Sequence, residues 1–124
     1  LSAHQSATGR SILARMPDAE IATLYHGHSS LGSLLSQLAA IRQNGFATSS
    51  QESTPGVDAI AMAVGDPATR EVISLCIVYP NGLVDDDGCA QMLAALAKAA
   101  GKIAADFGDS AFVAPKFEHK DSYA

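Results

Sequence analysis

The sequence lacks most of the features that mark secreted, membrane-spanning or nucleic-acid-binding proteins. Its 124 residues include two cysteines, Cys76 and Cys89, and their spacing gives neither a disulfide framework nor a metal-binding motif. No apolar run approaches the roughly 20 residues that span a bilayer, and no signal-peptide pattern opens the chain. The eight basic residues are scattered, without the stripe of positive charge that follows a phosphate backbone. We therefore expect a cytoplasmic protein in which this chain contacts neither a membrane nor DNA.

The composition predicts one soluble globular domain. Apolar residues make up 48% of the chain and charged residues 17%, with a formal net charge of −5 at pH 7. This balance is typical of a folded protein, and 124 residues are enough to bury a core. The first residues show neither an initiator methionine nor a capping pattern, so we expect the chain to be part of a longer protein.

Two apolar runs rich in β-branched residues form the centre of the predicted fold. Residues 57–64 and 72–79 are bounded by glycine and proline and lie about one hairpin turn apart, which predicts paired antiparallel strands. Side chains alternate along a strand, so one face of the hairpin carries large residues and the other carries small ones. The large face consists of Ile60, Met62, Val64, Ile73, Leu75 and Ile77. The small face consists of Val57, Ala59, Ala61, Ala63, Val72, Ser74, Cys76 and Val78.

The small face has two interpretations that composition does not separate. Small side chains let a helix pack closely against a sheet, and they also leave room for a ligand over it. From the hairpin alone we favour the packed helix.

Helices on both sides of the hairpin in the chain predict an α+β fold class. These predictions rest on capping residues, on proline and glycine stops, and on apolar residues at spacings of three and four. The four expected helices cover residues 6–16, 17–25, 30–44 and 85–107, and a short strand covers residues 46–50. The third helix is amphipathic and the last ends at Gly108.

Three polar motifs have simpler explanations than a metal or catalytic site. His26-Gly27-His28, even with His4, lacks carboxylate or cysteine ligands, and a glycine after a helix is a stop signal. The three aspartates 85–87 precede a long helix, where the helix dipole favours negative charge. Glu52 lies in a polar loop without a histidine or second carboxylate beside it, so we expect a solvated or backbone-bonded residue. No metal ion and no cofactor are predicted.

Several separate motifs occur in an order that is typical of one known family. They are Ser-Ala-Thr-Gly-Arg-Ser-Ile-Leu-Ala from residue 6, Pro-Asp-Ala-Glu-Ile from residue 17, Ile-Arg-Gln-Asn-Gly-Phe-Ala from residue 41, Glu52 followed by Pro-Gly, and an Ala-rich strand before a second strand that ends in Pro80. This order resembles the effector-binding domain of IclR-family transcriptional regulators. The resemblance implies a GAF-like α+β domain, an antiparallel sheet flanked by helices, that senses a small carboxylic acid.

The resemblance also implies a division of the chain and a set of partners. Residues 1–108 correspond to the effector-binding domain, and we expect the sheet to be incomplete at its N-terminal side because the family has further strands upstream. Residues 109–124 are expected to form a C-terminal tail that is ordered only if something holds it. Members of the family form homodimers or homotetramers and bind DNA through an N-terminal winged helix-turn-helix, which this chain lacks.

The family's ligand pocket, carried over residue by residue, falls on eight positions. They are Leu1, Ala7, Thr8, Ser49, Val57, Ala59, Cys76 and Val78. The last four belong to the small face of the hairpin, so a pocket over that face becomes the preferred interpretation. Unpaired backbone N–H groups near Ala7 and Thr8 could receive a carboxylate, with Ser49 adding a hydroxyl and Gly9 letting the helix approach the sheet.

The pocket positions differ from those of family members that bind very small keto acids. Such members have an acidic residue where this chain has Ser49, a cysteine where it has Ala59, and serines at Cys76 and Val78. Tyr79 also replaces the glycine that is usual before the proline. This less polar surface predicts a larger effector, with an apolar or aromatic body and one carboxylate.

Two other functions stay open at this point. The Ala-rich helix over residues 87–107 could serve a purely structural oligomerisation module that binds no effector. A small hydrolase would use Cys76 or Ser49 as its nucleophile, but neither has a motif that supplies a base and an oxyanion hole. A thiol inside an apolar strand is also expected to be inert. We therefore predict no catalytic residue and no enzymatic activity.

Overall fold

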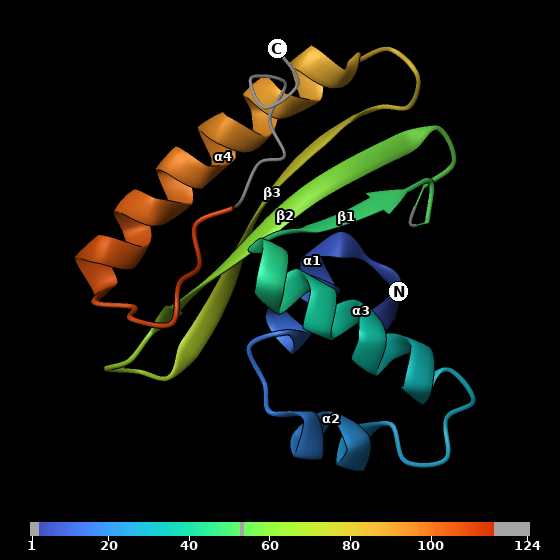
Figure 1. Ribbon diagram of the computed structural model, residues 1–124, viewed down its shortest axis with the longest axis vertical. Helices are drawn as coiled ribbons and strands as arrows, with labels where there is room; N and C mark the ends of the chain where they lie inside the picture. The colour runs from blue at the N-terminus through green and yellow to red at the C-terminus, as the bar shows by residue number, and fades with distance from the viewer. Residues whose placement is uncertain (1–2, 53, 116–124) are drawn as a thin grey trace.

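The computed structural model describes residues 3–52 and 54–115. In chain order its elements are the 3-10 helix η1 (Ala3–Gln5), α1 (Ala7–Leu13), α2 (Asp18–Leu24), α3 (Leu31–Asn44), β1 (Ala47–Ser50), β2 (Val57–Asp66), β3 (Glu71–Pro80) and α4 (Asp86–Phe107). They form an open sheet with helices on both of its faces (Figure 1). The predicted helices and strands are all present, and the predicted α+β fold class is confirmed.

The three strands form one antiparallel sheet in the order β1-β2-β3. β2 and β3 pair over their full length of ten residues, from Val57 opposite Pro80 to Asp66 opposite Glu71. The turn between them closes with a hydrogen bond from the Arg70 N–H to the Asp66 carbonyl at 2.7 Å. The predicted hairpin is therefore confirmed, and β3 lies at an edge of the sheet that the described residues form.

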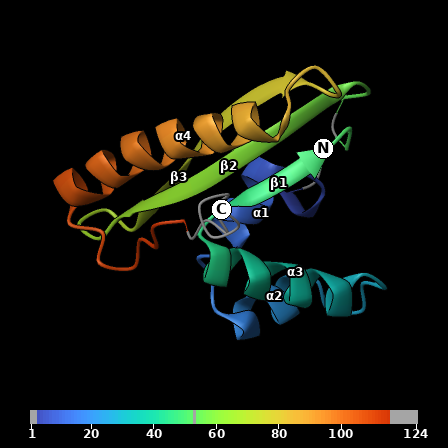
Figure 2. The same cartoon turned by 45° about the horizontal axis from the view of Figure 1, so that its top comes forward.

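The large-residue face of the hairpin is covered by α4, which crosses it along its length (Figure 2). Ile60, Met62 and Val64 of β2 are buried in one cluster with Leu93 of α4. The predicted core face is thus confirmed for β2, whereas Ile73 of β3 is 44% exposed. Every residue of β3 is at least partly exposed, because this strand has a neighbour on one side only among the described residues.

The two ends of α4 are fixed by the residues that the sequence predicts. The Asp85 carboxylate accepts a hydrogen bond from the Gly88 N–H at 2.8 Å, and Gly108 adopts a left-handed conformation with φ of 75°. The aspartate run therefore caps a helix start, as expected from the dipole. Among the described residues no helix, α4 included, combines the length and apolar character needed to cross a membrane.

The opposite face of the sheet carries α1, with α2 and α3 packed beyond it (Figure 2). An apolar cluster holds these three helices together, and it consists of Leu13, Ala14, Ile21, Leu34 and Leu38. Arg42 near the end of α3 donates hydrogen bonds to the carbonyls of Ala14 and Met16 at 2.7 and 2.8 Å. Those carbonyls follow the end of α1, so one guanidinium ties α3 to the connection between α1 and α2.

The described part of the predicted tail is held by one carboxylate. Asp109 accepts hydrogen bonds from the Gly65 N–H at 2.9 Å and from the Arg15 guanidinium at 2.5 Å. Burial would raise the pKa of Asp109, but these hydrogen bonds outweigh it and lower the pKa below its usual range. The segment 109–115 is therefore attached to the sheet and to the connection between α1 and α2, while residues 116–124 lie outside the described part of the chain.

Candidate functional site

A cavity of about 120 Å³ lies between the start of α1 and the small-residue face of the sheet. It is lined by Ser6, Ala7, Thr8, Ser49, Thr54, Val57, Ala59, Cys76 and Val78. Seven of the eight residues that the sequence predicts as a pocket are therefore brought together around one space. The eighth, Leu1, lies outside the described residues. Ligand binding in this cavity stays a prediction.

Strand register explains why residues so distant in sequence meet here. Ser49 of β1 lies opposite Ala59 of β2, which in turn lies opposite Val78 of β3. These three residues form one row across the sheet and share a face, because cross-strand partners point the same way. Cys76 and Val57 each lie two residues from a member of the row on the same face, so they extend the floor of the cavity.

The small-residue face both packs a helix and leaves a cavity, so neither sequence interpretation excludes the other. Ala7 of α1 is buried in a cluster with Ala47, Ala59 and Ala61 of the sheet. Alanine side chains let α1 lie close to the strands at that point. The cavity remains beside this contact, toward Val57 and Val78, where the helix begins.

The polar groups of the cavity are hydroxyls, and none of its lining residues is charged. Ser6 is the N-cap of α1, and its Oγ accepts a hydrogen bond from the Gly9 N–H at 3.0 Å. Ser49 and Thr54 contribute hydroxyls from the other side. The neighbouring Ser50 points away from the cavity and donates a hydrogen bond to the Asp58 carboxylate at 2.9 Å. The site is thus suited to a ligand with one polar end and an apolar body.

Two lining residues, Ser6 and Thr54, are missing from the sequence prediction. Ser6 had a local signal, since an N-cap lies beside the first residues of its helix. Thr54 is in the loop between β1 and β2, where no periodicity shows which way a side chain points. Its position depends on how that loop is held.

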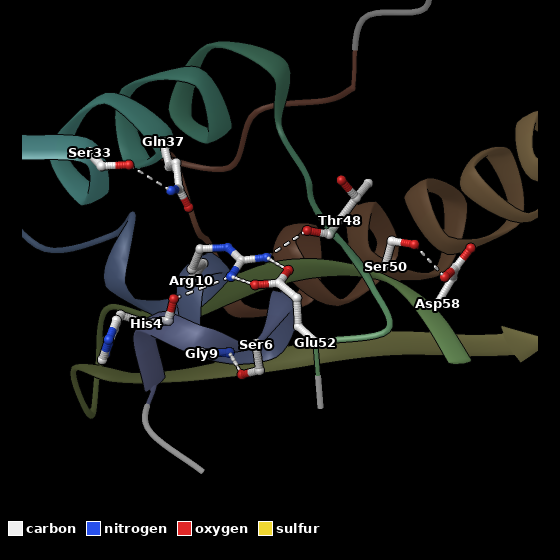
Figure 3. A network of polar contacts seen from close by, with 10 residues as sticks. All are labelled: His4, Ser6, Gly9, Arg10, Ser33, Gln37, Thr48, Ser50, Glu52 and Asp58. Atoms are coloured by element: carbon white, nitrogen blue, oxygen red, sulfur yellow. Dashed lines mark hydrogen bonds and ion pairs between the residues drawn. The ribbon is translucent and has the colours of Figure 1, made fainter. Parts of the chain in front are cut away.

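A buried arginine holds the loop and the helix start together (Figure 3). Arg10 of α1 is 5% exposed, and its two terminal nitrogens donate to the two Glu52 carboxylate oxygens at 3.0 and 2.7 Å. The same guanidinium donates to the carbonyl of Thr48 at 2.7 Å and to that of His4 at 3.2 Å. Glu52 is exposed, as expected, but it is also the ion-pair partner of a buried side chain, a role that was not predicted. The sequence did not reveal this pair because Arg10 and Glu52 lie 42 positions apart.

Gly9 serves a different contact from the one expected. A Cβ atom at this position would lie 2.0 Å from the carbonyl oxygen of Ala3 in η1, far inside van der Waals contact. The missing side chain therefore lets η1, rather than the sheet, pack against α1. Because His4 of η1 accepts a hydrogen bond from Arg10, this contact belongs to the same framework.

The two cysteines differ in their surroundings. Cys76 is exposed on the edge strand, contrary to the expectation of a thiol inside an apolar strand, and Val78 beside it is 67% exposed. The cavity is thus open along β3. Cys89 of α4 is half-buried, and its thiol contacts the Tyr79 hydroxyl at 4.0 Å. Burial, and then this contact with Cys89, raise the pKa of Tyr79 to about 12.

The described residues show no catalytic arrangement around either candidate nucleophile. Neither Cys76 nor Ser49 has a hydrogen bond to a histidine or a carboxylate in the described part of the chain. His4 and His28 pack edge to face with ring centroids 5.0 Å apart, and both contact the ring of Tyr25. No group of three or more metal-binding side chains occurs within residues 3–52 and 54–115.

Comparison with known proteins places this fold and these residues in a recognised group. Residues 1–105 match the family model described as bacterial transcriptional regulator IclR C-terminal. The HTH-type transcriptional regulator XynR of Escherichia coli (strain K12) is 29% identical over 96 residues, which cover 69% of this chain and 38% of XynR. The chain therefore spans well under half the length of this curated relative.

Two crystal structures illustrate the similarity of the fold. An IclR transcriptional regulator from Silicibacter sp. TM1040 superposes with a TM-score of 0.77 at 19% identity, covering 91% of this chain and 49% of that one. The inducer-binding domain of the PobR transcription factor from Acinetobacter, a double mutant in complex with 3-hydroxybenzoic acid, superposes with a TM-score of 0.72 at 23% identity. That match covers 84% of this chain and 66% of the PobR domain.

Proposed function

The chain belongs to the IclR family of bacterial transcriptional regulators, whose C-terminal regulatory domain it matches, and from this premise we propose that it binds a small carboxylic acid effector. The carrying observation is that seven residues inferred from the family pattern line a single cavity. They come from α1 and from all three strands, so a chance grouping of surface residues would not give this set.

The proposed pose follows from the chemistry of the cavity walls. The carboxylate lies at the start of α1, where backbone N–H groups of Ala7 and Thr8 and the hydroxyl of Ser49 are available as donors. The apolar part of the effector lies over Ala59 and Val78. No charged side chain lines the cavity, so a second carboxylate inside it would lack a partner. We infer a preference for monocarboxylates over dicarboxylates.

The volume of the cavity limits how much of the effector can lie inside it. A volume of about 120 Å³ is well below the roughly 300–1,000 Å³ of most small-molecule sites, so only part of an effector fits inside. An apolar or aromatic body therefore extends through the open side, over the exposed Val78 on β3. PobR offers a parallel at the level of fold, since its inducer-binding domain is complexed with an aromatic monocarboxylic acid.

The regulatory role belongs to a longer protein in this proposal. Effector binding here controls DNA binding by an N-terminal winged helix-turn-helix, in a cytoplasmic homodimer or homotetramer. In this proposal the domain acts by binding its effector and not by catalysis.

A thermal-shift screen tests the proposal. The chain is screened against aliphatic and aromatic mono- and dicarboxylates, with Val78→Glu as the site variant and Ser50→Ala as the control on the opposite face. An effector at about a hundred times its dissociation constant should stabilise the parent and Ser50→Ala by roughly 2.7 kcal/mol, and stabilise Val78→Glu distinctly less. If no acid shifts the folded parent, the effector proposal fails and an oligomerisation module without a ligand takes its place.

A further inference from the structure

A second and larger cavity lies at the other end of α1. It has a volume of about 530 Å³, within the roughly 300–1,000 Å³ of small-molecule sites, and it shares no lining residue with the first cavity. Its walls come from the α1–α2 connection, the end of α3, β2 and the segment after α4. We call it the Arg15 cavity, and its main lining residues are Ser11, Arg15, Met16, Phe46, Met62 and Phe112.

The walls of the Arg15 cavity suit an apolar ligand body. Met16 supplies a flexible, polarisable thioether, and Phe46 and Phe112 supply aromatic rings, while Met62 lies fully buried behind them. Such side chains adapt to a flat or a linear hydrocarbon group. The cavity is therefore not specialised for a polar metabolite such as a sugar, which would leave its hydroxyls without partners.

Two guanidinium groups also line the cavity, and they differ in the hydrogen bonds they have left to make. All three nitrogens of Arg42 are used, by the carbonyls of Ala14 and Met16 and by the Asp18 carboxylate. Within the described residues, Arg15 donates one hydrogen bond, from Nη2 to Asp109. An arginine carries five N–H donors, so Nε and Nη1 of Arg15 can still donate to an anion. Its side chain is 18% exposed, which strengthens such a bond relative to one in water.

We propose that the Arg15 cavity is a second ligand site, for a monocarboxylate with an aromatic or medium-chain aliphatic body. The carboxylate meets the free edge of the Arg15 guanidinium, and the body lies among Met16, Phe46 and Phe112. The proposed site does not depend on the effector cavity, although both cavities border α1. Ser11, which lines the Arg15 cavity, donates a hydrogen bond at 2.7 Å to the carbonyl of Thr8, which lines the other.

The three methionines of the chain provide the test. Met16 and Met62 line the Arg15 cavity, whereas Met92 of α4 packs against the same core cluster as Met62 without lining the cavity, and it serves as an internal control. The chain is labelled with ¹³C at the methionine methyl groups and titrated with octanoate, 1-naphthoate and the neutral analogue 1-octanol. We expect saturable shifts of Met16 and Met62 with at least one acid, a shift of Met92 that stays small, and weaker binding of the alcohol.

Variants test whether binding of the acid requires both its carboxylate and the space inside the Arg15 cavity. Arg15→Met should weaken acid binding about tenfold or more, whereas Arg70→Met, which removes a charge from the β2–β3 turn, should not. Because Arg15→Met also loses the bond to Asp109, Ala111→Trp provides a second variant that fills the cavity from an exposed lining position. Ala111→Trp should abolish the methionine shifts in a protein that remains folded.

The outcomes separate this proposal from the effector cavity. Val78→Glu should leave the Met16 and Met62 responses intact, even if it abolishes stabilisation by an effector. If Val78→Glu removes both, the acid binds in the effector cavity and the Arg15 site is refuted. The proposal is also refuted if neither acid shifts Met16 and Met62 up to its solubility limit, or if Arg15→Met and Arg70→Met behave alike.

Discussion

The carboxylate of Glu52 accepts hydrogen bonds from both terminal nitrogens of Arg10, at 2.7 and 3.0 Å, and this pair joins α1 to the loop after β1. The two partners are unequal, because the Arg10 side chain is 7% exposed and that of Glu52 is 40% exposed. Arg10 also serves two backbone carbonyls, those of His4 and Thr48. The arginine therefore organises the frame of the effector cavity, and the glutamate mainly balances its charge.

This asymmetry predicts unequal costs for removing the two partners. Arg10→Met leaves Glu52 and two carbonyls without their donor and should lower the free energy of unfolding by about 2–4 kcal/mol. Glu52→Gln keeps an acceptor beside the arginine but leaves the buried guanidinium without its counter-charge, and it should cost about 1–2 kcal/mol, less than Arg10→Met. Urea denaturation measures both. Equal losses would mean that the carboxylate, rather than the bonds to the carbonyls, carries the contribution of Arg10.

Arg10→Lys should behave like the methionine variant rather than like the parent. A lysine presents three donors from one atom and cannot span Glu52, Thr48 and His4 in the planar geometry of a guanidinium. We expect a loss of at least about 1.5 kcal/mol by urea denaturation, although the charge is kept. A lysine variant as stable as the parent would show that charge alone suffices at this position.

A third prediction concerns the contact between α1 and η1. Gly9→Ala improves helix propensity by up to about 1 kcal/mol, but its Cβ would lie 2.0 Å from the Ala3 carbonyl oxygen. Relieving this overlap requires η1 to move, so we expect a net destabilisation of about 1–3 kcal/mol. The matched control is Gly101→Ala within α4, where the nearest atom lies 3.7 Å away and the same change should stabilise by about 0.5–1 kcal/mol. If both variants raise the free energy of unfolding, η1 can move away from α1 at little cost and the close approach at Gly9 is not rigid.

Asp109 predicts a pH dependence of stability. Because hydrogen bonds from Gly65 and Arg15 lower its pKa in the folded state, its contribution is complete above the unfolded pKa of about 3.9 and is lost as the pH falls through the folded pKa. Asp109→Asn should lower stability by about 1–3 kcal/mol at pH 7. The difference in free energy of unfolding between Asp109→Asn and the parent should become smaller below about pH 4. Urea midpoints between pH 2 and pH 7 measure this difference, and a constant difference would show that Asp109 acts by packing alone.

Much of the fold is predictable from local sequence rules. The hairpin and its two faces follow from alternation, and Ser6, Asp85 and Gly108 mark helix ends that the structure has in those places. Exposure on β3 was not predictable in the same way. It depends on which strand lies at the edge of the sheet, and this is a property of pairing between distant segments rather than of the strand itself.

The candidate site shows the same division. The floor residues Ala59, Cys76 and Val78 follow from strand alternation, and the family pattern adds the start of α1 and Ser49. The pair of Arg10 and Glu52 and the role of Asp109 were not predictable, because each joins elements that no local rule brings together. For the same reason the Arg15 cavity has no signature in the sequence, since its walls come from four separate parts of the chain.

The two adjacent serines of β1 provide the sharpest test of the effector cavity. Ser49 lines the cavity in one row with Ala59 and Val78, whereas Ser50 faces the other way and bonds Asp58. A hydroxyl that donates to a carboxylate contributes about 1.5–3 kcal/mol, so Ser49→Ala should weaken binding of the effector found in the screen at least tenfold. Ser50→Ala removes the same atom one residue away and should leave affinity unchanged. Isothermal titration calorimetry measures both constants. Equal affinities in the two variants would show that the effector's carboxylate does not contact β1. The backbone N–H groups at the start of α1 would then be its remaining donors.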